Sequence, residues 1–121
     1  MFPELHTDRF LLNQIVATDQ AFIFKGLSHP DITPFYGVAY KTMDDTKRQM
    51  YFYDDLWREK KGIWWKITDR ITGEPLGACG INNYQLAHEK AEIGYWLLPE
   101  YWRKKIMSEV MPVMIGHVFS H

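Results

Sequence analysis

The sequence has little cysteine and no long run of hydrophobic residues. Its single cysteine, Cys79, cannot form a disulfide within the chain, so we expect a reducing compartment. The longest apolar runs fall far short of the roughly 20 residues that span a bilayer. Residues 1–10 contain no apolar core of the length found in signal peptides. We therefore expect a cytoplasmic protein without a membrane segment.

The sequence also lacks an excess of charge of either sign. Fourteen Lys and Arg residues face 15 Asp and Glu residues, which gives a net charge of −1. This balance argues against nucleic-acid binding through overall charge. The five histidines are scattered, and "AHEKAE" lacks the second histidine of the zinc signature His-Glu-x-x-His, so we expect no metal. Cys79 lies in an expected strand and is interpreted as a small core residue rather than a nucleophile.

What the sequence does contain is enough apolar bulk for one core. Its 121 residues suit one domain, and 46% of them are hydrophobic, with 16% aromatic. We therefore treat residues 1–121 as a single domain.

The first half of the chain predicts one strand and two helices. Residues 5–12 alternate loosely and predict a strand. Thr18-Asp19 is a candidate cap for a helix over 20–27, and 31–40 is expected to be a loop. A second helix begins after the capping-box pattern Thr42–Asp45 and ends by Gly62.

The second half predicts three strands and a final helix. The strands are expected over 63–69, 76–84 and 91–98, with a Thr-Gly turn between the first two. The final helix is expected from about residue 104 to the end. Strands and helices are partly segregated along the chain, which favours the α+β class.

The junction between the last strand and the final helix has features of an anion site. Three cationic residues, Arg103, Lys104 and Lys105, follow Pro99 where the helix is expected to start. The first amides of a helix have no intrahelical partner, and the helix dipole adds positive charge there. Such a junction suits a diphosphate. The alternative is a solvated basic turn.

Three segments together resemble the GNAT acetyltransferases, and in particular the branch of ribosomal-protein N-acetyltransferases of the RimJ/RimL type. "LHTDRFLL" resembles the opening strand of that branch, and "ITGEPLGACGI" resembles its hairpin. "AEIGYWLLPEYWRKKIMSE" resembles its central strand and pyrophosphate loop. The resemblance implies a three-layer fold with a mostly antiparallel sheet flanked by helices.

The resemblance also implies acetyl-CoA as co-substrate and direct transfer of acetyl to a primary amine of a small molecule or peptide. The backbone near Trp96, Leu97 and Leu98 would pair with the pantetheine arm. The amides of six residues would hold the pyrophosphate: Arg103, Lys104, Lys105, Ile106, Met107 and Ser108.

The catalytic base that the resemblance implies is Glu92, on the central strand. Period-two alternation places Glu92 on one strand face with Gly94 and Trp96, and we expect a partly apolar cleft around it. An exposed or salt-bridged strand carboxylate is the alternative. Phe35 and Tyr36 are candidates for the substrate entry, with ordinary packing as their alternative.

The chain departs from the family pattern at two positions of the loop. Arg103 and Lys105 stand where this branch usually has glycine, which adopts strained angles at little cost. The Lys105 side chain either blocks the diphosphate or swings outward and pairs with it.

The family also continues beyond the final helix, so its C-terminal strands and roughly the last third of its domain are expected to be missing. That helix would then leave Val113, Ile115, Val118 and Phe119 short of partners, which predicts a homo-oligomer through the C-terminal helix. A catalytically inactive GNAT-like binding or oligomerisation module is the alternative function.

Overall fold

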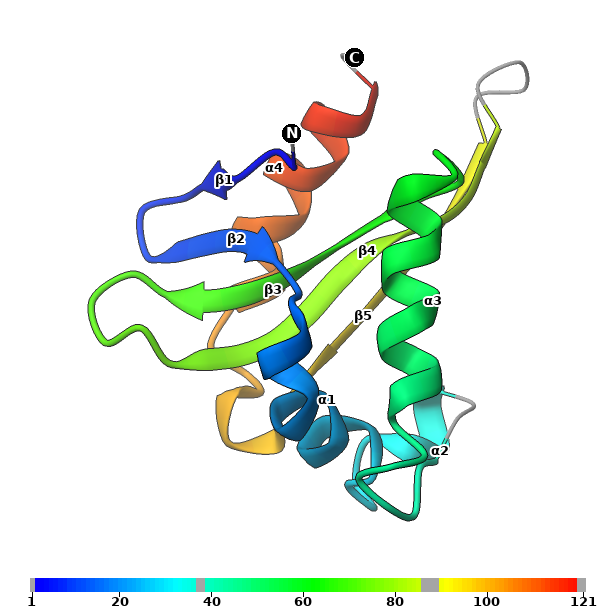
Figure 1. Cartoon of the computed structure of the whole chain (residues 1–121). Coiled ribbons are helices and arrows are strands. Elements are labelled where there is room, and N and C mark those ends of the chain that lie inside the picture. The colour runs from blue at the N-terminus through cyan, green and yellow to red at the C-terminus, as the bar shows by residue number, and fades with distance from the viewer. Residues whose placement is uncertain (1, 37–38, 86–89, 120–121) are drawn as a thin grey trace.

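The fold is a five-stranded antiparallel sheet between two layers of helices (Figure 1). It is seen in a computed structural model that describes residues 2–36, 39–85 and 90–119. The sheet order follows the chain: β1 (Leu5–His6), β2 (Phe10–Gln14), β3 (Ile63–Asp69), β4 (Pro75–Gln85) and β5 (Lys90–Leu97). The helices are α1 (Gln20–Leu27), α2 (Thr33–Tyr36), α3 (Lys47–Arg58) and α4 (Ile106–Phe119). This arrangement confirms the expected α+β fold with three layers.

Alternation along the strands builds one hydrophobic core on each face of the sheet. Trp64 packs with α1 and α3, whereas its neighbour Trp65 packs against α4. Trp96 and Leu97 divide between the two faces in the same way. The core under α4 includes Phe10, Leu12, Ile67, Cys79, Ile106, Val110 and Met114, all buried. The sheet thereby fixes which side of β5 each side chain occupies.

Most predicted elements are confirmed, but two regions of the first half differ. The helix over 20–27 and the strand over 63–69 have the predicted bounds, and β4 and β5 lie within one residue of theirs. The strand expected over 5–12 is wrong in its middle, because a turn separates β1 from β2. The Phe10 amide donates to the Thr7 hydroxyl at 3.0 Å, and the Thr7 amide donates to the Phe10 carbonyl at 2.9 Å. The loop expected over 31–40 contains the short helix α2.

Gly62 was predicted to end α3, but in the structure it has a different role. Lys60, and not Gly62, has the left-handed backbone that ends the helix, with a φ of 58°. A Cβ at Gly62 would lie 2.2 Å from the carbonyl oxygen of Ile81, so Gly62 lets the chain pass close to β4.

Candidate functional site

The candidate anion site is the loop of residues 102–105, between β5 and α4. The 3₁₀ turn η3 (Pro99–Tyr101) reverses the chain after β5, and the loop then leads directly into α4. The indole Nε1 of Trp102 donates to the Leu97 carbonyl at 2.8 Å. This bond ties the start of the loop to the end of β5. The expected junction of strand, turn and helix is therefore present in the fold.

Two residues of the loop adopt the backbone conformation that glycine favours. Arg103 has a φ of 63° and Lys105 a φ of 59°, whereas Lys104 between them is not left-handed. A left-handed conformation costs a residue with a Cβ about 1–2 kcal/mol. The loop therefore carries side chains at two positions whose backbone conformation glycine would adopt at little cost.

The loop also concentrates hydrogen-bond donors and positive charge. Among the hydrogen bonds between described residues, none uses the amide of Arg103, Lys104 or Lys105 as its donor. In an anion-binding nest, an alternation of left- and right-handed residues turns successive amides toward one concave side. The positive φ angles of Arg103 and Lys105 fit the left-handed positions of such a nest. All three side chains are exposed, and within the described part of the chain none of them forms a salt bridge. The exposed Lys105 side chain does not pack into the loop.

The other predicted pyrophosphate residues open α4. Ile106 is buried in the core beneath the helix, Met107 is half-buried and Ser108 is exposed. The first turn of an α-helix leaves its amides without intrahelical partners, so these three residues add main-chain donors next to the loop.

Three residues near the end of β5 were predicted to pair with the pantetheine arm, and they differ in which way their backbone groups face. The amide of Leu98 donates to the Leu76 carbonyl of β4 at 3.0 Å, so it is paired inside the sheet. Backbone groups alternate in direction along an antiparallel strand, and those of Trp96 therefore also face β4. Those of Tyr95 and Leu97 face the outer edge, where β5 ends the described sheet. Of the three predicted residues, Leu97 is the one whose backbone faces this edge.

A pocket of about 420 Å³ lies on the α3 face of the sheet near β5. Its floor includes the Trp64 indole, whose Nε1 donates to Asn82 Oδ1 at 2.8 Å. The hydroxyl of Tyr40 donates to Gln49 Oε1 at 2.9 Å, and burial raises the pKa of Tyr40 while the nearby charge of Arg48 opposes the rise. The remaining lining residues are Arg48, Phe52 and Gly94. Sequence reasoning missed this pocket, because its walls come from Tyr40, from α3 and from the strands β3, β4 and β5, and so join residues as far apart in the sequence as Tyr40 and Gly94.

Glu92 lies at the border of this pocket. It is the cross-strand partner of Asn82 and stands two residues before Gly94, and both of these residues line the pocket. Glu92 is exposed to solvent, so the described residues do not form the partly apolar cleft that we expected around it.

Phe35 and Tyr36, the residues predicted at the substrate entry, form the end of α2, and their side chains lie outside the described part of the structure.

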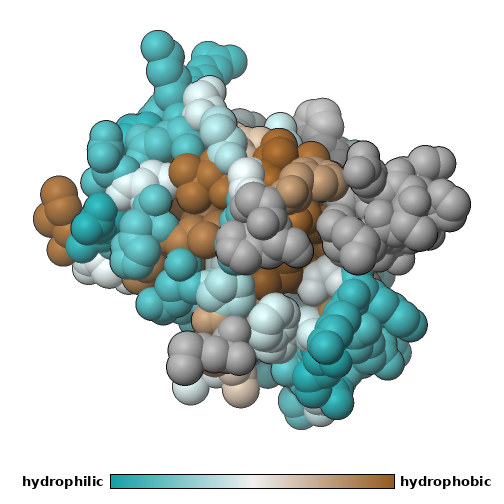
Figure 2. All heavy atoms as spheres, turned by 90° about the horizontal axis from the view of Figure 1, so that it is seen from above, coloured by the Kyte–Doolittle hydropathy of each residue, from teal (hydrophilic) through white to brown (hydrophobic). Residues whose placement is uncertain are grey.

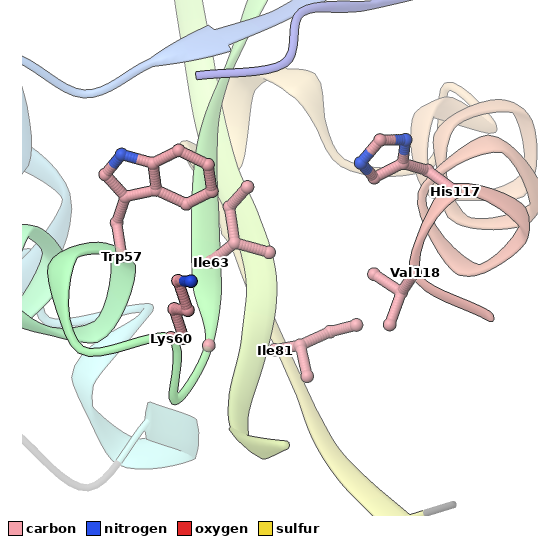
Figure 3. Close-up of a pocket in the computed structure, with 7 residues that line it drawn as sticks. Trp57, Lys60, Ile63, Ile81, His117 and Val118 are labelled. Carbon is pink, nitrogen blue, oxygen red and sulfur yellow. The ribbon is translucent and has the colours of Figure 1, made fainter. Parts of the chain in front are cut away.

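A second pocket, of about 300 Å³, lies at the opposite end of α4 from the loop (Figure 3). Trp57, Lys60 and Ile63 stand on one side of it, and His117 and Val118 of α4 stand on the other. Figure 2 looks onto this end of the molecule, where hydrophobic atoms gather near the centre. Because α4 has 14 residues, the pocket is roughly 20 Å from the loop and is not part of the anion site.

Other kinds of site find little support in the described residues. No group of three or more His, Cys, Asp or Glu side chains among them is placed to hold a metal ion. No helix in the described ranges has the length and apolar character needed to cross a membrane. Cys79 is fully buried, and burial raises the pKa of its thiol, which fits its predicted role as a core residue.

Comparison with known proteins identifies the family. The sequence profile of the acetyltransferase (GNAT) domain matches residues 9–121. An uncharacterized N-acetyltransferase, YoaA of Bacillus subtilis, is 36% identical over 121 residues, which cover 99% of this chain and 68% of YoaA.

Solved structures share the fold at lower identity. A ribosomal-protein-S5-alanine acetyltransferase from Vibrio fischeri superposes with a TM-score of 0.82 at 17% identity, over 98% of this chain and 68% of its own. RimL, a ribosomal L7/L12 α-N-protein acetyltransferase solved with coenzyme A, gives a TM-score of 0.71 at 16% identity, over 95% and 67% of the two chains. The chain thus spans about two thirds of the length of these proteins. On the match of the family profile and of YoaA, this chain belongs to the GNAT acetyltransferase family.

Proposed function

We propose that the protein is an N-acetyltransferase that moves acetyl from acetyl-CoA directly to a primary amine, with residues 1–121 forming a single domain. The observation that carries the proposal is the loop at the start of α4. It combines two left-handed residues, amides that donate to no described residue, and three exposed cations at a helix N-terminus. That combination favours a diphosphate, which coenzyme A contains.

In this proposal the two ends of coenzyme A meet different parts of the chain. The amides of the loop and of the first turn of α4, from Arg103 to Ser108, hold the diphosphate, and the side chains of Arg103, Lys104 and Lys105 add charge. The pantetheine arm runs along the open edge of β5 and accepts from the amide of Leu97, whose carbonyl already accepts from Trp102 Nε1. The thioester then arrives beside Glu92.

Glu92 acts as the general base. It accepts a proton from the ammonium group of the acceptor, directly or through one water, and leaves a neutral amine. The amine nitrogen then forms a bond to the acetyl carbonyl carbon and releases its excess proton as the amide forms. The carbon–sulfur bond breaks with its electron pair on sulfur, and the thiolate of coenzyme A leaves and takes up a proton from solvent. A cytoplasmic pool of acetyl-CoA would supply the reaction.

The pocket beside Glu92 is proposed to hold the acceptor, a small-molecule or peptide amine. Its aromatic wall, Tyr40 and Phe52, suits an apolar side chain of the acceptor. Arg48 is exposed and has no ion pair among the described residues, so its charge favours an acceptor with a carboxylate near the amine. Phe35 and Tyr36 remain candidates for the entry to this pocket.

We also propose that the C-terminal end of α4 meets a second copy of the chain. Phe119 is 48% exposed and Val113 is half-buried. The expectation that Ile115 and Val118 lack partners is wrong, because both pack against the core under α4. The exposure of Phe119 also favours the second candidate function, a non-catalytic module that acts through α4. Sedimentation as a monomer at micromolar concentration would contradict the oligomer, whereas absence of acetyl-CoA binding would favour this alternative.

Calorimetric titration with acetyl-CoA tests the main proposal. We expect saturable binding, and acetyl transfer to amino acids faster than to the corresponding decarboxylated amines. Glu92→Gln should slow transfer roughly 100-fold or more and leave the affinity for acetyl-CoA unchanged. Glu59→Gln, at the exposed end of α3, is the matched control. Absence of heat and of any thermal shift at millimolar acetyl-CoA would contradict the proposal.

A further inference from the structure

Arg9, the residue before β2, reaches across to the loop and to α4. Its Nε donates to Glu109 Oε1 at 2.6 Å, and these residues are 100 positions apart in the sequence. Its Nη1 and Nη2 each donate to the Lys104 carbonyl at 3.3 Å, and Nη2 also donates to the Lys105 carbonyl at 3.4 Å. One guanidinium thus contacts the loop and the first turn of the helix that follows it.

Other contacts hold this guanidinium in place. Glu109 also accepts from the Thr7 hydroxyl and, at 2.9 Å, from the Arg9 amide. Burial alone would raise the pKa of Glu109, but these hydrogen bonds and the charge of Arg9 lower it below its ordinary value. The guanidinium carbon lies 4.8 Å from the centroid of the Phe10 ring, a cation–π distance. Arg9 is therefore fixed between an ionised carboxylate and a buried aromatic ring.

The contacts to the two carbonyls determine where the next two amides point. In a trans peptide the C=O of one residue and the N–H of the next lie on opposite sides of the chain. Because Arg9 holds the carbonyls of Lys104 and Lys105 on its own side, the amides of Lys105 and Ile106 point away from Arg9. These amides belong to the set proposed to grip the diphosphate. The pair with Arg9 also neutralises Glu109, whose charge in the first turn of α4 would repel a diphosphate.

We infer that Arg9 is a positioning residue for coenzyme A binding. It touches neither the diphosphate nor the reacting atoms, and it acts by turning two peptide planes of the loop so that their N–H groups face the ligand. The inference rests on the proposed function for its ligand, but the fixed loop is a property of the free protein. It also gives a physical role to Thr7 and Arg9 of the opening segment "LHTDRFLL".

Arg9→Lys separates this role from the pair with Glu109. A lysine can still pair with Glu109, but its compact ammonium lacks the rigid fork that reaches two carbonyls together. We expect Arg9→Lys to unfold at nearly the wild-type denaturant concentration, yet to bind coenzyme A roughly tenfold more weakly, as for the loss of a charge-assisted hydrogen bond. The KM for acetyl-CoA should rise while the KM for the amine stays constant.

Arg70→Gln is the matched control for loss of an arginine near the same turn. Arg70 donates to the Thr7 carbonyl at 2.7 Å, and none of its side-chain hydrogen bonds with described residues reaches the loop. We expect Arg70→Gln to bind coenzyme A as the wild type does. If Arg9→Lys also binds coenzyme A with wild-type affinity, the inference is overturned.

A measurement on the free protein keeps this inference separate from the proposed function. Backbone order parameters of Lys104 and Lys105 should fall from about 0.85 toward 0.6 in Arg9→Lys and stay high in Arg70→Gln. Unchanged order parameters in Arg9→Lys would overturn the positioning role, whatever the protein binds. If Arg9→Lys loses order in the loop and the wild-type protein does not bind coenzyme A, the result supports the fixed loop and contradicts the proposed function.

Discussion

Lys105→Gly should stabilise the protein, although it removes a side chain and a charge. Lys105 has a φ of 59°, a conformation that costs a residue with a Cβ about 1–2 kcal/mol and costs glycine almost nothing. Glycine also makes the unfolded chain more flexible, which lowers the free energy of unfolding by roughly 0.4–1 kcal/mol. The net gain is about 0.5–1 kcal/mol, because the relieved strain exceeds the added entropy of the unfolded chain.

Urea denaturation followed by tryptophan fluorescence measures this gain, since Trp64, Trp65 and Trp96 are buried. For a domain of this size the midpoint of thermal unfolding should rise by about 2–5 °C. Lys104→Gly is the matched control, because Lys104 is exposed and not left-handed, and it should lose roughly 0.4–1 kcal/mol. The reasoning is refuted if Lys105→Gly loses as much stability as Lys104→Gly.

Three further predictions concern the core, the thiol and pH. Gly26→Ala places a Cβ 2.1 Å from the Trp96 ring and should lower the free energy of unfolding in urea by about 1–3 kcal/mol. In the control Gly116→Ala the added Cβ meets no described atom within 4 Å, and the free energy of unfolding should rise by up to about 1 kcal/mol. Equal effects of the two substitutions would refute the packing argument. Cys79 should react with a thiol reagent only as fast as the protein unfolds; rapid reaction in the native state would contradict its burial. Glu109 has a lowered pKa when folded, so its stabilisation is present above pH 4.5 and is lost as the pH falls through the folded pKa. Unfolding free energies should therefore fall less steeply with acid in Glu109→Gln than in the wild type.

Local sequence patterns predicted the elements whose side chains alternate clearly between two environments. Trp64 and Trp65 face opposite cores, and the strand containing them was predicted with its observed bounds. The opening strand was mispredicted because the Thr7 hydroxyl accepts from the Phe10 amide and makes a turn. That side-chain bond competes with a ladder that the apolar pattern alone would continue.

The candidate site was predictable where it is local in sequence. The resemblance marked Arg103 and Lys105 as side chains at usual glycine positions, but it did not predict that both would adopt the left-handed backbone that the structure shows. The contacts of Arg9 with Glu109 and the loop were not predictable, because they join residues 95 to 100 positions apart. The pocket near Glu92 was missed for the same reason, since α3 supplies most of one wall.

The central claim is that main-chain amides at the start of α4 grip the diphosphate of coenzyme A. Amide chemical shifts of the ¹⁵N-labelled protein, followed by NMR during titration with coenzyme A, test it most directly. We expect saturable shifts at Lys105 and Ile106, and little change at those residues with pantetheine, which lacks the diphosphate. Saturation of the protein with coenzyme A while both amides stay at their free positions would contradict the claim.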